Sequence, residues 1–126
     1  MMVEIEVANR SGAELDLGAA KELIRRVLAA EGVGEGEVGL QLVGPAEMRA
    51  LKRDHLGVDE ETAALAFPID GREELPPGLP RQLGDVVLCP QVVGEAWRGP
   101  LVHALLHLVG YDHGSSMEAR ERAYAE

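Results

Sequence analysis

The chain has 126 residues, 46% of them hydrophobic, which is enough for one globular domain with its own core. Twelve basic against 22 acidic residues give a net charge of −10, which disfavours non-specific coating of a phosphate backbone, so we expect no DNA partner and only local contact with RNA. A single cysteine, no signal-like N-terminus and no apolar run of roughly 20 residues predict a soluble cytoplasmic protein without a disulfide or a membrane span.

The N-terminal part of the sequence predicts a strand followed by a helix. Residues 3–7 alternate apolar and acidic side chains, which is typical of a strand with one buried face. In residues 16–31 the apolar positions recur every three or four residues, as on an amphipathic helix. Asp16 is suited to cap this helix and Gly32 to end it.

The middle of the sequence predicts three more strands and a second helix. We expect a strand over residues 37–43 and a helix over residues 44–55, with Pro45 in its first turn. Two short apolar runs, residues 64–67 and 85–89, fit buried strands better than helices. The residues between these runs are rich in Pro and Gly and predict a loop.

Two helices are expected at the C-terminal end. An apolar helix begins after Pro100 and stops near Gly110, and Ser115 with Glu118 forms a candidate capping box for the last helix. The resulting order of strand, helix, strand, helix, two strands and two helices indicates an α+β fold.

Three of the four histidines lie within the stretch HALLHLVGYDH, which starts at residue 103. His103 and His107 are one helical turn apart, so both imidazoles can reach one metal ion. Gly110 lets the chain leave the helix, and a turn could return His113 to the same point. Three neutral nitrogens with an open fourth position are the ligand set of a catalytic zinc site, although other divalent transition metals accept the same ligands.

Two other interpretations of this stretch compete with a metal site. The histidines could be partly buried residues whose nitrogens bond a carbonyl or a carboxylate, but three matched positions with a glycine hinge are more specific than that. The spacing also matches the metzincin proteases, in which a glutamate general base follows the first histidine. Ala104 stands at that position here, so we do not expect peptide hydrolysis.

The same stretch resembles the signature of the YbeY family of bacterial metal-dependent endoribonucleases, H-G-x-L-H-L-x-G-Y-D-H, at every specified position except Ala104. The family's L-G-D before a hydrophobic strand is matched by residues 83–85, and a weaker similarity covers residues 51–67. The resemblance implies a single domain, residues 1–126, in which a small mixed sheet of about four strands packs with helices and a metal cleft lies at one end. It also implies one zinc ion per chain, or another divalent ion, on His103, His107 and His113.

Several positions depart from the family pattern. Lys52 replaces an Asn and His55 a Tyr, and Leu56 stands where many relatives carry a functional arginine. Ala63 and Ala66 replace an Asp and a Ser. These changes remove polar groups from the expected site and leave the proposed metal ligands in place.

Two aspartates are candidate catalytic residues, each with a plainer alternative. Asp112 could orient a ligand histidine, or bond its own backbone in the turn. Asp85 could line the cleft, or cap the loop before its strand. Cys89, inside an apolar run, is most simply a small buried hydrophobe.

Four basic residues are candidates for binding substrate. Arg49, Lys52 and Arg53 could hold a phosphate backbone, although a solvated helix face is the default for such a cluster. Arg98 and Trp97 could stack a base, although Trp97 is as well suited to the core.

These observations lead to three functional hypotheses. The first is a single-strand-specific endoribonuclease of ribosomal RNA maturation and ribosome quality control, whose zinc activates water. The second is a metal-containing binding factor that acts through ribosome-associated proteins, with little cleavage of its own. The third is a hydrolase of another phosphoester, because zinc hydroxide is not selective by itself.

Overall fold

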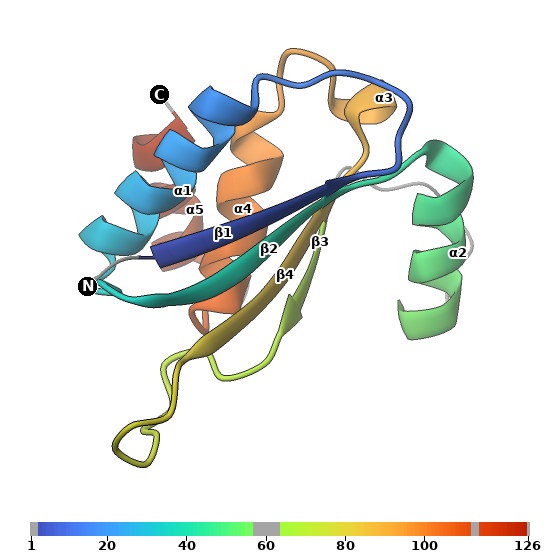
Figure 1. The fold of residues 1–126 in the computed structure, drawn as a ribbon. Coiled ribbons are helices and arrows are strands. Elements are labelled where there is room, and N and C mark those ends of the chain that lie inside the picture. Colours follow the sequence, from blue (N-terminus) through green and yellow to red (C-terminus); the bar gives the residue numbers. More distant parts are fainter. Residues whose placement is uncertain (1–2, 57–63, 112–113, 126) are drawn as a thin grey trace.

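The computed structural model describes residues 3–56, 64–111 and 114–125 (Figure 1). Within these residues the chain forms four strands and five helices. They are β1 (Val3–Asn9), α1 (Leu17–Ala30), β2 (Gly36–Leu42), α2 (Pro45–Leu56), β3 (Ala64–Pro68), β4 (Gln82–Leu88), α3 (Pro90–Val93), α4 (Arg98–Leu108) and α5 (Ser115–Ala125).

The four strands form one mixed sheet in the order β1-β2-β4-β3. β1 pairs with β2 and β2 with β4 in parallel, whereas β3 and β4 are antiparallel. Parallel neighbours need a crossover between them, and α1 supplies the one between β1 and β2. The predicted α+β fold with a small mixed sheet is therefore confirmed.

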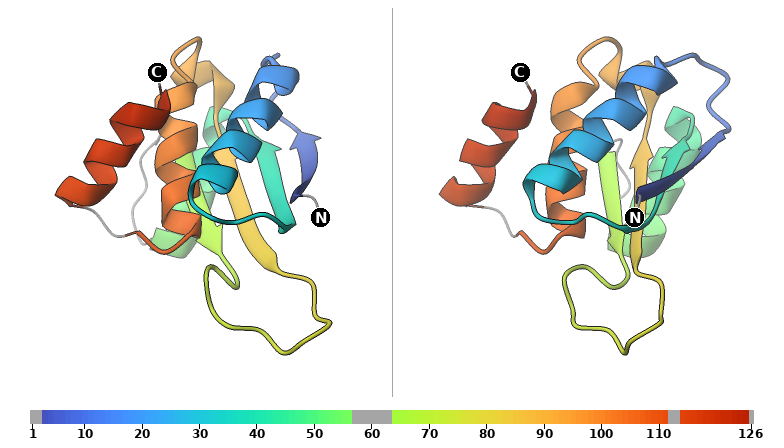
Figure 2. Two further views of the ribbon diagram at one scale, coloured as in Figure 1. Left: turned by 90° about the vertical axis from the view of Figure 1, so that its left-hand side faces the viewer. Right: turned by 60° about the vertical axis from the view of Figure 1, so that its left-hand side comes forward.

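The helices lie on both faces of the sheet. Figures 1 and 2 show α1, α4 and α5 on one face and α2 on the other. The alternation of side chains explains this division: Val86 and Leu88 of β4 belong to the main core with α1 and α4, whereas Val87 packs with Met48 of α2 in a smaller second core. Cys89 is fully buried in that second core, as expected.

Helix α4 packs between the sheet and the helices α1 and α5. Its apolar residues are almost completely buried, and they join the core residues of α1, β1, β2 and β4, against which Ala64 and Ala66 of β3 pack. This burial fixes the position of α4 relative to the sheet. The residues of α4 with at most 1% of their surface exposed are Leu101, Val102, Ala104, Leu105, Leu106 and Leu108.

Gly84 brings α4 close to the end of the β3–β4 hairpin. Its φ of +129° is a conformation that favours glycine. A Cβ atom here would collide with the carbonyl oxygen of Phe67 and would lie 3.1 Å from the side chain of Leu108. The glycine of the L-G-D motif is therefore required by packing.

Three local predictions differ from the structure. α4 begins at Arg98, two residues before Pro100, because a proline is tolerated within the first turn of a helix. α3 was not predicted because a single turn is too short to show a helical period. The capping box is also not formed: the backbone N–H of Glu118 donates to the carbonyl of Gly114 at 3.0 Å, and α5 begins at Ser115 itself.

The carboxylate of Glu31 joins four separate parts of the fold. Its side chain is only 2% exposed and accepts hydrogen bonds from the hydroxyls of Tyr111 (2.8 Å) and Tyr124 (2.6 Å). It also accepts from the guanidinium groups of Arg72 (2.8 Å) and Arg120 (2.9 Å). These partners come from the turn after α4, from α5 and from the loop between β3 and β4. We call these five residues the Glu31 cluster.

The cluster keeps Glu31 ionised despite its burial. Burial alone would raise the pKa of this carboxyl group, but hydrogen bonds from Tyr124 and Tyr111 and the charges of Arg120 and Arg72 outweigh it and hold the pKa below its ordinary value of 4.5. Because the pKa is lowered in the folded state, ionised Glu31 stabilises the fold above pH 4.5. That stabilisation is lost as the pH falls through the lowered pKa.

Glu31→Gln should lower the free energy of unfolding by roughly 2–3 kcal/mol at pH 7, because the two arginines lose their buried counter-charge. The deficit should shrink as the pH falls below about 4.5, where wild-type Glu31 also loses its charge. Urea unfolding followed by the fluorescence of buried Trp97 measures both values. Glu22→Gln, the same change on the exposed side of α1, should cost less than about 0.5 kcal/mol. A deficit that is equal at pH 7 and pH 4 would contradict this account.

Candidate metal centre

His103 and His107 occupy the one stripe of α4 that the core does not cover. Every other residue from Leu101 to Val109 is buried, whereas these two are half-buried. Because they are four residues apart, they lie one turn apart on the same face of the helix.

The two rings lie close together and share one pattern of contacts. Their centroids are 4.8 Å apart with an interplanar angle of 80°. Nδ1 of His103 lies 2.9 Å from Oε2 of Glu121, and Nδ1 of His107 lies 2.9 Å from the carbonyl oxygen of Tyr111. Because each Nδ1 has a partner within the protein, a shared metal ion would be bound through the two Nε2 atoms. This donor set fits zinc, for which imidazole nitrogen is a preferred ligand.

The helix ends in a turn that sends the chain back along α4. The N–H of Gly110 donates to the carbonyl of His107 at 3.1 Å, and the N–H of Tyr111 donates to the carbonyl of Leu106 at 3.0 Å. This pair of bonds is the Schellman motif, and Gly110 supplies the φ of +99° that it needs. The predicted departure of the chain at Gly110 is therefore confirmed.

The third proposed ligand, His113, and the candidate catalytic residue Asp112 lie outside the described residues. Within the part of the chain that is described, no group of three or more possible metal ligands gathers at one point. The described residues thus include two of the three proposed ligands and the turn that ends α4. The side chains of His55, Leu56 and Ala63 are likewise outside the description.

The turn after α4 is anchored to the body of the protein at two points. The Nε atom of Arg72 donates to the carbonyl of Val109 at 2.9 Å, and Tyr111 donates its hydroxyl to Glu31. Burial, followed by the bond to the Glu31 carboxylate, raises the pKa of Tyr111, so the hydroxyl stays a donor at neutral pH. The Glu31 cluster therefore fixes the chain as far as Tyr111, two residues before the third proposed ligand.

Sequence reasoning missed Glu31 and Glu121. A signal existed for Glu31: it is the C-cap of α1, where the helix dipole disfavours a negative charge, and the last turn carries no basic residue. No comparable signal marks Glu121, whose partner His103 is on another helix.

Asp85 lies on the sheet face opposite α4. It is in the interior of β4, half-buried, and it pairs with Phe67 and Gly39 across the neighbouring strands. Gly39 is needed there, because a Cβ at that position would collide with the Asp85 carboxylate. The structure therefore does not bring Asp85 together with His103 and His107.

The predicted substrate-binding residues fall into two groups. One group lies on α2, which packs on the sheet face opposite α4. It consists of Arg49, Lys52 and Arg53, whose spacing of three and four residues places them on one stripe of the helix. Arg53 pairs with the neighbouring Asp54 at 3.5 Å. Arg98 begins α4, and its guanidinium carbon lies 4.4 Å from the ring centre of Trp97. Trp97 is only 5% exposed, so it is a core residue capped by Arg98.

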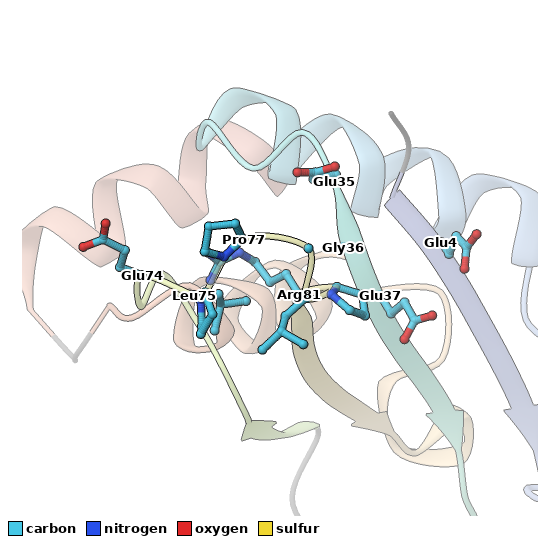
Figure 3. A pocket seen from close by; sticks show the side chains of 12 residues that line it. Glu4, Glu35, Gly36, Glu37, Glu74, Leu75, Pro77 and Arg81 are labelled. Atoms are coloured by element: carbon cyan, nitrogen blue, oxygen red, sulfur yellow. The ribbon is translucent and has the colours of Figure 1, made fainter.

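A cavity of about 710 Å³ lies between the loop after β3 and the first residues of β1 and β2 (Figure 3). Neither His103 nor His107 lines it. Its charged lining residues are Glu4, Glu35, Glu37, Glu74 and Arg81. An excess of carboxylates repels phosphate, so this cavity is not a binding surface for RNA.

Every helix among the described residues falls short of the length and apolarity that crossing a bilayer requires.

Comparison with known proteins identifies the family of the chain. The family model described as Endoribonuclease YbeY matches residues 6–126.

Proteins named Endoribonuclease YbeY from Halorhodospira halophila and Salinispora tropica are 38% and 37% identical to the chain. The alignments cover 96% and 94% of this chain and 90% and 88% of those proteins. The solution structure of TM1509 from Thermotoga maritima superimposes with a TM-score of 0.61 at 26% identity, covering 98% of this chain and 87% of that one. The chain belongs to the YbeY endoribonuclease family.

Proposed function

We propose that the chain is a single-domain, zinc-dependent endoribonuclease that cleaves single-stranded RNA in ribosomal RNA maturation and ribosome quality control. The observation that carries this proposal is the pair His103 and His107, whose Nδ1 atoms have protein partners and which share the uncovered stripe of α4. The family to which the chain belongs supports the choice of RNA as substrate.

His103, His107 and His113 would hold the metal. A zinc ion on three imidazoles, when bound, supplies a water with a pKa of about 7 and a Lewis acid for the phosphoryl oxygen. Glu121 and the carbonyl of Tyr111 keep the two helix rings oriented, and the turn at Gly110 ends α4 before the segment that carries His113. Asp112, next to that ligand, is proposed to orient it or the attacking water.

The proposed path of the RNA crosses the outer edge of β3. This strand ends the sheet, with α4 packed against it on one face and Met48 and Leu51 of α2 on the other. Arg49, Lys52 and Arg53 would hold phosphates on the α2 side of this edge. Asp85 faces the α2 side of the sheet and is proposed to act there, away from the metal.

A binding factor with little cleavage of its own is the second candidate. It is favoured by Ala66, which packs on the α4 face of β3 where the family pattern has a serine. In that case the metal site would serve the fold, and contacts with ribosome-associated proteins would carry the function. RNA cleavage by the purified protein distinguishes the two candidates.

Zinc-loaded wild-type protein should cleave a single-stranded ribosomal RNA precursor, and His107→Ala should reduce the rate at least about 100-fold, because one of three ligands is lost. Gel analysis of end-labelled RNA measures the rate. The variant must be purified identically, so that a contaminating nuclease appears equally in both samples. Equal cleavage by the two proteins, or no cleavage by either, would contradict the proposed nuclease activity and favour the binding factor.

The double variant Arg49→Ala/Arg53→Ala should raise KM for RNA about tenfold at low salt and change kcat little, because phosphate contacts bind without specifying the reaction. The effect should diminish as salt is raised. Steady-state cleavage at two salt concentrations measures it. Arg25 is an exposed residue of α1, which lies on the opposite face of the sheet from α2. Arg25→Ala also removes a positive charge and should leave KM unchanged. If KM for the double variant is the same as KM for the Arg25→Ala control, RNA does not bind at Arg49 and Arg53.

A further inference from the structure

Glu121 of α5 lies against the first proposed ligand. Its Oε2 atom is 2.9 Å from Nδ1 of His103, and the side chains are 30% and 35% exposed. We propose that Glu121 is a positioning residue of the metal centre: it accepts the Nδ1–H of His103 and so presents Nε2 of that ring to the metal. The inference deepens the proposed function and rests on it.

The side of the ring that Glu121 touches separates positioning from ligation. A carboxylate that bound the metal beside His103 would lie near Nε2, whereas Glu121 lies at Nδ1. His107 has the same arrangement, with the backbone carbonyl of Tyr111 at its Nδ1. Both helix rings are thus fixed by an acceptor at the same atom, and a carboxylate in that place also makes the opposite nitrogen a stronger donor to the metal.

The Glu31 cluster explains how α5 can hold Glu121 in place. Arg120, adjacent to Glu121, donates to Oε2 of Glu31 at 2.9 Å, and the Tyr124 hydroxyl donates to the same atom at 2.6 Å. Arg26 of α1 adds a bond to the backbone carbonyl of Tyr124 at 2.7 Å, and Met117 is buried at the start of the helix. Contacts before and after Glu121 therefore set its distance from His103.

Glu118 supplies a matched control on the same helix. It is one turn from Glu121, carries the same charge and is exposed. Among the described residues its side chain makes no hydrogen bond or ion pair. Replacing it removes the same long-range attraction for a cation without removing a contact to a histidine.

The test is the zinc affinity of the full chain, measured by competition with a chelating dye. Glu121→Ala should weaken zinc binding about 10–100-fold relative to wild type, whereas Glu118→Ala should change it less than about threefold. Glu121→Gln keeps an oxygen that accepts the Nδ1–H and should recover part of the affinity. Melting temperatures of the three metal-free variants should agree within about 3 °C, because the Glu121 contact is partly exposed.

The outcomes separate the inference from the proposed function. Tight binding by the wild type with equal affinities for Glu121→Ala and Glu118→Ala would overturn the positioning role alone. A wild type that binds no zinc would overturn the proposed metal centre and the inference with it. Loss of affinity only in step with a lower melting temperature would show that Glu121 acts through the stability of α5, which also contradicts the inference.

Discussion

The burial of α4 is the constraint on which the other features of this molecule depend. The helix touches the sheet, α1 and α5, so all but one stripe of its surface must be apolar. That stripe carries His103 and His107, and their spacing of one turn follows from the helix itself. The core therefore sets the position of the imidazoles, and Glu121 and the carbonyl of Tyr111 set the orientation of the rings.

A second layer of contacts connects this helix to the rest of the fold. Glu31 ends α1 at a position where a negative charge is unfavourable, and four donors from distant segments compensate for it. Two of these segments contact the histidines, the turn after α4 through Tyr111 and the helix α5 through Glu121. The third, the loop between β3 and β4, bonds the end of α4 through Arg72. One buried carboxylate thus connects α1 of the core to the segments that hold the proposed metal ligands in place.

The confirmed predictions rest on local signals. The periodicity of α1, its cap Asp16 and the departure of the chain at Gly110 all depend on residues a few positions apart. The features that were missed depend on distant or very short segments, and the wrong local predictions concern the ends of helices. Glu31 is 41 to 93 residues from its partners, and Ser115 does not cap α5 because Gly114 already accepts the bond in question. The same division applies to the site, where the histidine pair was predictable and its acceptor Glu121 was not.

The alternation of residues in β1 has a consequence for how copies of the chain behave toward one another. β1 forms one edge of the sheet, and an open edge is a template on which another strand can pair. Glu4 and Glu6 are exposed on the face that α1 does not cover, so two such edges brought together would place like charges side by side. The acidic strand that opens the sequence therefore protects the sheet against edge-to-edge aggregation, at no cost to the core on its other face.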